Sequence, residues 1–359
     1  MPGERIDLPP GVLHPREAVV NMSPYSPPTG GRAGKLRLDF NENTVGASSS
    51  VIAFLQEHLS AGALALYPEY TEAKRELAAF YGVEEDEFIL TNGTDEAIQV
   101  LINTYVDDGD EVIVPHPSYA MYRFYAELAG ANVQEIGYRK EKLAFPLQEL
   151  LDAIGPRTKA VLIANPNNPT GTGTSAANIE RIVERASHAA VLVDEAYYEF
   201  SGVTVLPLLR DHPNLFVSRT FSKVYGMAAM RVGCLFSDSG NVGFLHKSQS
   251  PYSVNALGAL AARAASRDQA YVQKYVGEVL AARELLYVGL EELGIPYYAS
   301  QANFVLFQAG KRAVAVRDAL RERGILVRDR SYEIVGCVRV TVGTREQMRR
   351  FLAELKEIW

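Results

Sequence analysis

The sequence is short of cysteine, of histidine and of long apolar runs. Its two cysteines, Cys234 and Cys337, lie inside apolar strand-like runs, which predicts buried thiols rather than a disulfide framework. The six histidines are scattered, without a pair at metal-ligand spacing. No apolar run approaches the roughly 20 residues that cross a bilayer, and the N-terminus has no signal-peptide pattern. We therefore expect a cytoplasmic protein without a metal site or a membrane segment.

Positive charge is also in short supply. There are 36 Lys and Arg residues against 43 Asp and Glu, a formal net charge of -7. A general nucleic-acid surface needs an excess of basic residues, so we expect no nucleic-acid partner. The apolar and charged fractions, 47% and 22%, are typical of a globular protein, and 359 residues suffice for a large domain plus a smaller one.

Short apolar runs alternate with helical patterns from about residue 85 to 240. The runs are continuously apolar, as in strands covered on both faces, and lie at 88–90, 112–114, 161–163, 191–193, 215–217 and 232–236. Helical patterns at 94–106, 119–129 and 176–190 separate them. This alternation predicts an α/β fold, with a mainly parallel sheet flanked by helices.

The pattern changes after about residue 250, which predicts a second unit. A long helix is expected over 254–293, followed by strands at 303–307, 325–327 and 337–342 and helices at 313–323 and 345–358. These elements indicate a smaller α+β domain. We expect an N-terminal arm over 1–40 that packs with the small domain, a large domain over 41–250 and the small domain over 251–359.

Two loops after the strands could hold polar parts of a ligand, because active sites in such sheets form at the carboxyl ends of the strands. At Gly93-Thr94 a strand gives way to a helix, whose free N–H groups can bind an anion; an ordinary helix cap is the alternative. The run NPNNPTG around Asn168 specifies a rigid turn, which could present the Asn168 amide or be purely structural.

Two further loops carry charge. Asp194 ends a buried strand, where a carboxylate needs a cation or strong donors; a protonated heterocyclic nitrogen or a structural ion pair would serve. Lys223 follows another strand among small hydroxyl residues, where desolvation can lower the pKa of an amine that forms imines. A solvated surface lysine is the alternative reading of Lys223.

A glycine-rich run, 171–176, superficially fits a dinucleotide-binding pattern with Asp194 downstream. A proline-containing turn of seven residues separates these glycines from their strand. The dinucleotide pattern requires the glycines directly after the strand, so a nicotinamide or flavin site is disfavoured.

In combination and in this order, the loops resemble those of the fold-type I, pyridoxal-phosphate (PLP) dependent aminotransferases of class I and II. The most specific segments are NPNNPTG, DEAYYEF and SRTFSKVYGMAAMRVG. VRVTVGTRE near the C-terminus and NMSPYS with LDFNEN near the N-terminus are similar to the histidinol-phosphate aminotransferase-like branch. The resemblance covers nearly the whole chain and implies a seven-stranded-type sheet.

The resemblance implies a role for each loop around the cofactor. Lys223 would form the Schiff base to PLP and move a proton at the substrate Cα, and Asp194 would pair with the pyridine nitrogen. Asn168 and Tyr197 would hydrogen-bond the ring oxygen, and Tyr119 would stack on the ring. The residues implied around the cofactor phosphate are Gly93, Thr94, Asp95, Thr220, Ser222 and Arg231, with Asp95 orienting the loop.

The resemblance also implies a homodimer and a substrate pocket. Tyr67 would reach the phosphate in the neighbouring subunit, so that two subunits share each active site. Arg339 would take a carboxylate by bidentate pairing, and Arg328 would face the substrate phosphate. Tyr25, Asn43 and Asn303 are expected to complete this end of the pocket.

The implied reaction is transfer of the amino group of histidinol phosphate to 2-oxoglutarate. An aminotransferase for aromatic or other amino acids stays open, because Thr44 stands where the family usually has proline, beside the substrate pocket. A PLP-dependent decarboxylase or oxidase on the same scaffold also stays open. A non-catalytic PLP-binding sensor is disfavoured, because Lys223 and Arg339 are both present.

Overall fold

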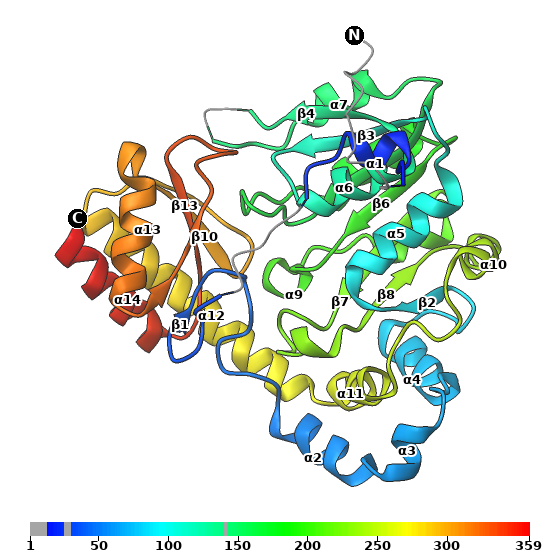
Figure 1. The fold of residues 1–359 in the computed structure, drawn as a ribbon, viewed down its shortest axis with the longest axis horizontal. Coiled ribbons are helices and arrows are strands. Elements are labelled where there is room, and N and C mark those ends of the chain that lie inside the picture. Colours follow the sequence, from blue (N-terminus) through cyan, green and yellow to red (C-terminus); the bar gives the residue numbers. More distant parts are fainter. Residues whose placement is uncertain (1–12, 25–29, 140–141) are drawn as a thin grey trace.

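The computed structural model describes residues 13–24, 30–139 and 142–359. A seven-stranded sheet forms the centre of the larger part of the chain (Figure 1). Its order is β2-β8-β7-β6-β5-β3-β4, and only β8 runs antiparallel to its neighbours, which confirms the predicted mainly parallel sheet. The strands are β2 (Phe88–Thr91), β3 (Glu111–His116), β4 (Asn132–Gly137), β5 (Thr158–Ala164), β6 (Ala190–Asp194), β7 (Leu215–Thr220) and β8 (Gly233–Phe236).

The central strands carry continuous apolar runs because helices cover both faces of the sheet. Alternate residues of β6 show this: Val191 and Val193 belong to one buried cluster and Leu192 to the other. One face is covered by α5 (Gly93–Tyr105), α6 (Ala120–Ala129) and α10 (Ser239–Ser248). The opposite cluster includes residues of α4 (Thr71–Tyr81), α7 (Leu147–Ala153), α8 (Ala176–Arg185), α9 (Tyr198–Ser201) and α11 (Ala256–Arg267). We call the sheet with these helices the large unit.

Strand β4 was not expected, and its position explains why. It lies at the edge of the sheet, pairs only with β3, and has only Val133 and Ile136 partly buried among exposed residues. Because an edge strand with one solvated face needs no continuous apolar run, it gives a weak signal in the sequence. The helices α2 (Ser49–His58) and α3 (Ala61–Ala65) complete this part of the chain (Figure 1).

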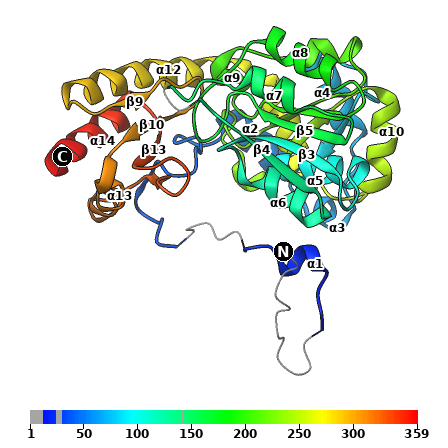
Figure 2. The same ribbon diagram turned by 90° about the horizontal axis from the view of Figure 1, so that it is seen from above.

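The helical stretch expected over 254–293 is present, but the structure divides it into two helices. They are α11 and α12 (Gln269–Glu292), and they meet at Asp268. The Asp268 carboxylate accepts a hydrogen bond from the Tyr271 backbone N–H at 3.2 Å and so caps α12. From this break α12 runs to the small sheet, as Figure 2 shows from above.

The C-terminal part forms a four-stranded antiparallel sheet of order β12-β13-β10-β9. Its strands are β9 (Tyr297–Tyr298), β10 (Phe304–Gln308), β12 (Arg328–Asp329) and β13 (Cys337–Thr341), and α13 (Ala313–Glu322) and α14 (Arg345–Ile358) flank it. A separate parallel pair joins β1 (Leu36–Arg37) to β11 (Ile325–Leu326). We call residues 293–359 together with β1 the small unit.

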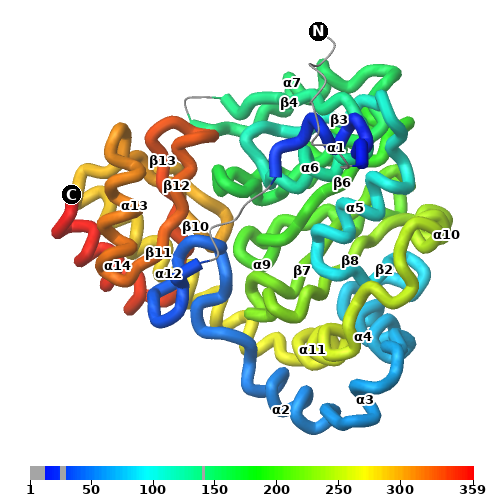
Figure 3. Tube along the Cα trace, viewed as in Figure 1, coloured from blue at the N-terminus to red at the C-terminus, as the bar shows by residue number. Residues whose placement is uncertain are grey.

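The described N-terminal residues touch both units. β1 lies in the small unit, whereas α1 (Glu17–Val20) lies beside α6 of the large unit (Figure 3). The Arg16 guanidinium donates to the Leu128 carbonyl in α6 at 3.1 Å. The arm therefore runs from the large unit to the small one.

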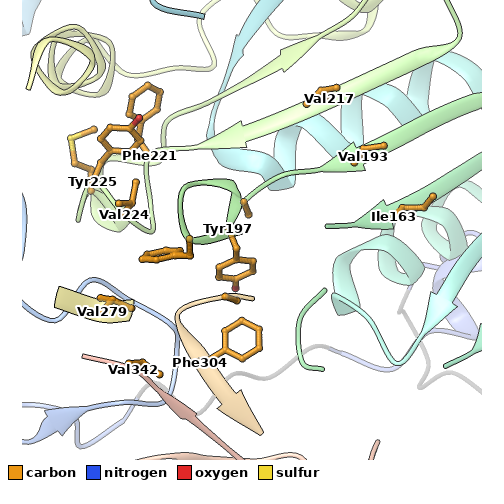
Figure 4. Close-up of a cluster of buried hydrophobic side chains, with 14 of the residues drawn as sticks. Ile163, Val193, Tyr197, Val217, Phe221, Val224, Tyr225, Val279, Phe304 and Val342 are labelled. Carbon is orange, nitrogen blue, oxygen red and sulfur yellow. The ribbon is translucent and has the colours of Figure 1, made fainter. Parts of the chain in front are cut away.

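The two units share one apolar cluster, drawn in part in Figure 4. Phe304 from the small unit points at Tyr197 from the loop after β6, with ring centroids 5.2 Å apart at 79°. Both side chains are buried. This contact fixes the small unit against the strand ends where ligands bind in sheets of this kind.

Candidate active site

A cavity of about 700 Å³ opens at the carboxyl ends of β5, β6 and β7. The large unit supplies most of its lining, and Phe40, Asn41 and a group of small-unit residues close the other side. Twelve of the predicted site residues line it: Thr94, Asp95, Tyr119, Asn168, Asp194, Tyr197, Thr220, Ser222, Lys223, Arg231, Arg328 and Arg339. Loops far apart in the sequence thus meet in one place.

Asp194 ends β6 and is 4% exposed. Its carboxylate accepts hydrogen bonds from the Tyr122 hydroxyl at 2.9 Å and the Ala196 backbone N–H at 3.1 Å. Burial raises the pKa of Asp194 to about 6, against these hydrogen bonds, which favour the ionised form. Among the described residues no basic side chain forms an ion pair with Asp194, so this buried carboxylate is suited to a ligand that brings a positive charge.

Lys223 lies in the loop after β7 and lines the same cavity as Asp194. Its ammonium donates to the Phe40 carbonyl at 3.3 Å and lies 5.7 Å from the centre of the Tyr197 ring. In the same loop the Thr220 hydroxyl accepts from the Ser222 backbone N–H at 3.1 Å, which fixes the turn before the lysine. The amine is therefore held by one carbonyl and an aromatic face.

The anion cup predicted at residues 93–95 forms at the start of α5. Gly93 has φ of +75°, and a Cβ built there would lie 2.5 Å from a guanidinium nitrogen of Arg231. The Arg231 guanidinium pairs with Asp95 at 3.2 Å, and Asp95 accepts from the Tyr119 hydroxyl at 2.7 Å. Only glycine allows this approach, so the arginine is brought to the N-terminus of a helix, a place suited to phosphate.

Asn168 and Tyr197 lie between the units. The Asn168 side-chain oxygen accepts from the Arg339 guanidinium, and the Tyr197 hydroxyl accepts from the Asn41 amide at 2.9 Å. Both side chains line the cavity, so each has a small-unit or N-terminal partner there.

Two predicted arginines, Arg328 and Arg339, sit opposite one another in the β12–β13 register. Arg339 is 4% exposed and donates to the Asp39 carbonyl at 2.7 Å. Desolvation, and after it the charge of Arg330, lowers the pKa of Arg339 to about 10. A buried guanidinium under this repulsion would be stabilised by an anionic ligand.

Asn43 is a correction, because it does not line the cavity. Its amide donates to the Val224 carbonyl and the Tyr271 hydroxyl, both at 2.8 Å, and accepts from the backbone N–H of Val45 and Gly46. With its hydrogen bonds used within the fold, it holds the loop. Asn41, two residues earlier, takes the place expected for it.

Gly93, Asn303 and Tyr67 also lie outside the cavity lining. Asn303 is fully buried behind it and donates to the Asn41 carbonyl at 3.2 Å, so it touches the site through Asn41. Tyr67 is 78% exposed and stacks on Tyr252. Tyr25 lies outside the described residues.

The structure adds residues that the sequence reasoning missed: Asn41, Tyr122, Arg330 and Glu333. Tyr122 had a usable signal, since it stands three residues after Tyr119 and shares a face of α6. Arg330 and Glu333 lie in a turn between β12 and β13 without a periodic pattern.

The glycines that superficially fit a dinucleotide pattern serve packing. A Cβ on Gly171 would lie 2.3 Å from the Ser300 hydroxyl, and one on Gly173 would lie 2.1 Å from the Gln301 amide. The Gln301 backbone N–H donates to the Gly171 carbonyl at 2.8 Å. These glycines let residues 300–301 of the small unit approach the large one.

Cys234 and Cys337 are free thiols, both buried, as predicted. Within 13–24, 30–139 and 142–359 no group of three or more His, Cys, Asp or Glu side chains could hold a metal ion. None of the helices described is both long and apolar enough to cross a membrane.

The chain is similar to known aminotransferases over nearly its whole length. Residues 33–355 match the family described as aminotransferase class I and II. The histidinol-phosphate aminotransferase of Symbiobacterium thermophilum is 37% identical over 355 residues, covering 95% of this chain and 97% of that protein. The enzyme of the same name from Bacillus subtilis (strain 168) is 34% identical, covering 96% and 99%.

A solved structure is similar over the same span. The histidinol-phosphate aminotransferase of Sinorhizobium meliloti, in complex with pyridoxal-5'-phosphate, matches with a TM-score of 0.86 and 25% identity. The match covers 97% of this chain and 98% of that one.

Proposed function

This chain belongs to the class I and II aminotransferase family, and on that premise we propose that it binds PLP and transfers the amino group of histidinol phosphate to 2-oxoglutarate. The observation that carries the proposal is the shared cavity. It brings a lysine, a buried carboxylate, an arginine at a helix N-terminus and two small-unit arginines to one place.

The residues present fit the cofactor. The buried Asp194 carboxylate is suited to a protonated ring nitrogen, and Arg231 beside Gly93 is suited to the phosphate, together with Thr94, Thr220 and Ser222. Tyr119 would cover the ring, and Asn168 and Tyr197 would contact its oxygen. Asp95 already holds both Arg231 and Tyr119, which supports a role in orienting the phosphate loop.

When bound, PLP supplies an electron-poor ring that stabilises negative charge at the substrate Cα. Asp194 keeps the ring nitrogen protonated, because an anion fixed in a buried place favours the positive form of its partner. Lys223 binds the cofactor at rest and moves the proton of the substrate Cα.

Arg328 and Arg339 would determine which substrates are accepted. Two guanidiniums in one cavity favour substrates with acidic groups. Glutamate offers two carboxylates, and histidinol phosphate offers a phosphate. The same pair of arginines can therefore serve both halves of the reaction.

Absorbance spectroscopy of the purified protein tests the function. We expect the visible band of lysine-bound PLP to disappear when histidinol phosphate is added and to return with 2-oxoglutarate. Disappearance with phenylalanine or tyrosine alone would instead assign an aromatic aminotransferase. Release of carbon dioxide or consumption of oxygen would indicate a decarboxylase or an oxidase, and absence of the band would refute PLP binding.

We also propose that two copies of the chain share their active sites. Tyr67 is 78% exposed, and the neighbouring Leu64, Leu66 and Tyr252 are 64%, 73% and 54% exposed. Exposed apolar side chains gathered around one segment favour contact with another chain. Tyr67 would then reach the PLP phosphate of the partner. Analytical ultracentrifugation should show a dimer. The Tyr67→Phe substitution should weaken PLP binding while the protein remains a dimer.

The proposed reaction places the protein in histidine biosynthesis in the cytoplasm. Two unpaired, buried thiols support a reducing compartment. The net charge of -7 favours small-molecule partners over nucleic acid. Restored growth without histidine, in a strain that lacks this activity, would support the placement, and failure to restore it would count against it.

A further inference from the structure

The small unit presents an unusual set of charges to the cavity. The described residues after 304 that line it are Arg328, Arg330, Tyr332, Glu333 and Arg339. Three guanidiniums thus face one carboxylate. Since like charges in a partly desolvated space repel, this side of the cavity favours an added anion.

Arg330 is held firmly at this place. Its backbone N–H donates to the Cys337 carbonyl at 2.9 Å, which anchors the turn to β13. One side-chain nitrogen donates to the Tyr332 hydroxyl at 2.8 Å and another to Glu333. The Arg330 and Glu333 side chains are 9% and 15% exposed. A solvated surface arginine would show neither this burial nor three fixed contacts.

Glu333 partly balances the cluster. Desolvation raises the pKa of Glu333, while Arg330 and then the more distant His116 and Arg339 favour its ionised form. Among the like charges around Arg339, Arg330 lowers the pKa of Arg339 more than Arg328 does. The charge of Arg330 therefore acts on Arg339, the residue proposed to bind an acidic group of the substrate.

We propose that Arg330 is a specificity-determining residue, which binds the distal acidic group of the substrate together with Arg328, and that Glu333 is a built-in competitor for its guanidinium. Without substrate, Glu333 keeps Arg330 oriented. A bound phosphate takes over as the partner of Arg330. This inference rests on the proposed function, and it makes a doubly charged distal group the preferred one.

The test uses the PLP-loaded enzyme and inorganic phosphate as the probe, with binding measured by titration calorimetry. Arg330→Gln removes a charge-assisted partner and should raise the Kd of phosphate by about 10-fold or more. Glu333→Gln keeps the shape but removes the competing charge, and should lower that Kd. Arg330→Lys should restore part of the affinity.

Control variants show whether a change in the Kd of phosphate is specific to Arg330 or follows from the loss of any arginine in the small unit. Arg317→Gln removes an arginine of α13 that pairs with Asp318 and does not line the cavity, and it should leave the Kd unchanged. In steady state, Arg330→Gln should raise the KM for histidinol phosphate more than it lowers kcat. The PLP spectrum of each variant reports whether the site is intact.

A higher Kd of phosphate in Arg330→Gln together with a lower Kd in Glu333→Gln would support the inference. If the pair were merely structural, both substitutions should raise the Kd. An unchanged Kd in Arg330→Gln, or a rise in both variants, would overturn the inference. If the wild-type enzyme does not accept histidinol phosphate, the proposed function fails. Phosphate binding to the variants still tests Arg330 in that case.

Discussion

The buried ion pair between Arg219 and Glu195 should be the most costly charge to remove in the large unit. Arg219 ends β7 and Glu195 follows β6, and their side chains are 5% and 0% exposed with a closest approach of 2.6 Å. Glu195 also accepts from the Thr204 hydroxyl at 2.9 Å and the Val205 backbone N–H at 2.6 Å. The pair thus joins the two strand ends that carry Asp194 and Lys223.

We expect Arg219→Leu to lower the free energy of unfolding by about 3–5 kcal/mol at neutral pH, the usual cost of leaving one buried partner unpaired. Burial already raises the pKa of Glu195, and the charge of Arg219 is the main factor that opposes this rise. Without Arg219 the carboxyl should protonate more readily, so the loss of stability should shrink as the pH is lowered.

Urea unfolding followed by circular dichroism measures this effect. The double variant Arg219→Leu with Glu195→Gln leaves no buried charge in the pair and should be more stable than Arg219→Leu alone. Arg123→Leu, which breaks a pair whose side chains are 56% and 32% exposed, is the matched control and should cost under about 1 kcal/mol. A loss below about 1 kcal/mol for Arg219→Leu, or a double variant no more stable than it, would refute the reasoning.

Three further predictions concern the cavity. Lys223→Ala should abolish both the lysine-bound PLP absorption and turnover, whereas retained turnover would remove this lysine from the reaction. Gly93→Ala should weaken PLP binding in equilibrium dialysis, because its Cβ would lie 2.5 Å from Arg231; Gly109→Ala, at φ +84° with nothing within 4 Å, controls for backbone strain alone. Burial raises the pKa of Asp194 from 3.8 to about 6, so PLP-free protein should lose stability as the pH rises through that window, because only the folded state still holds the proton. Urea unfolding at several pH values should show this fall, and Asp194→Asn should lack it; identical pH profiles would contradict the raised pKa.

Much of the fold could be predicted from the sequence, because a strand that is buried on both faces needs a continuous run of apolar residues. β5, β6 and β7 each contain a continuous apolar run, and each run is followed by polar residues. Strand β4 escaped prediction, because its exposed edge position removes the apolar run. The break at Asp268 escaped because residues on both sides of it are helical.

The sequence by itself determined which residues carry the chemistry at the strand ends, because Asp194 ends β6 and Gly93 and Lys223 lie in the short segments just after β2 and β7. Only the tertiary structure decided which residues approach from elsewhere. Asn41 rather than Asn43 lines the cavity, Tyr122 reaches Asp194 from α6, and the turn after β12 brings Arg330 into the cavity that Arg339 lines. The physical reason is that a strand fixes the position of its own loop, whereas the place of a side chain from another element depends on how whole units pack.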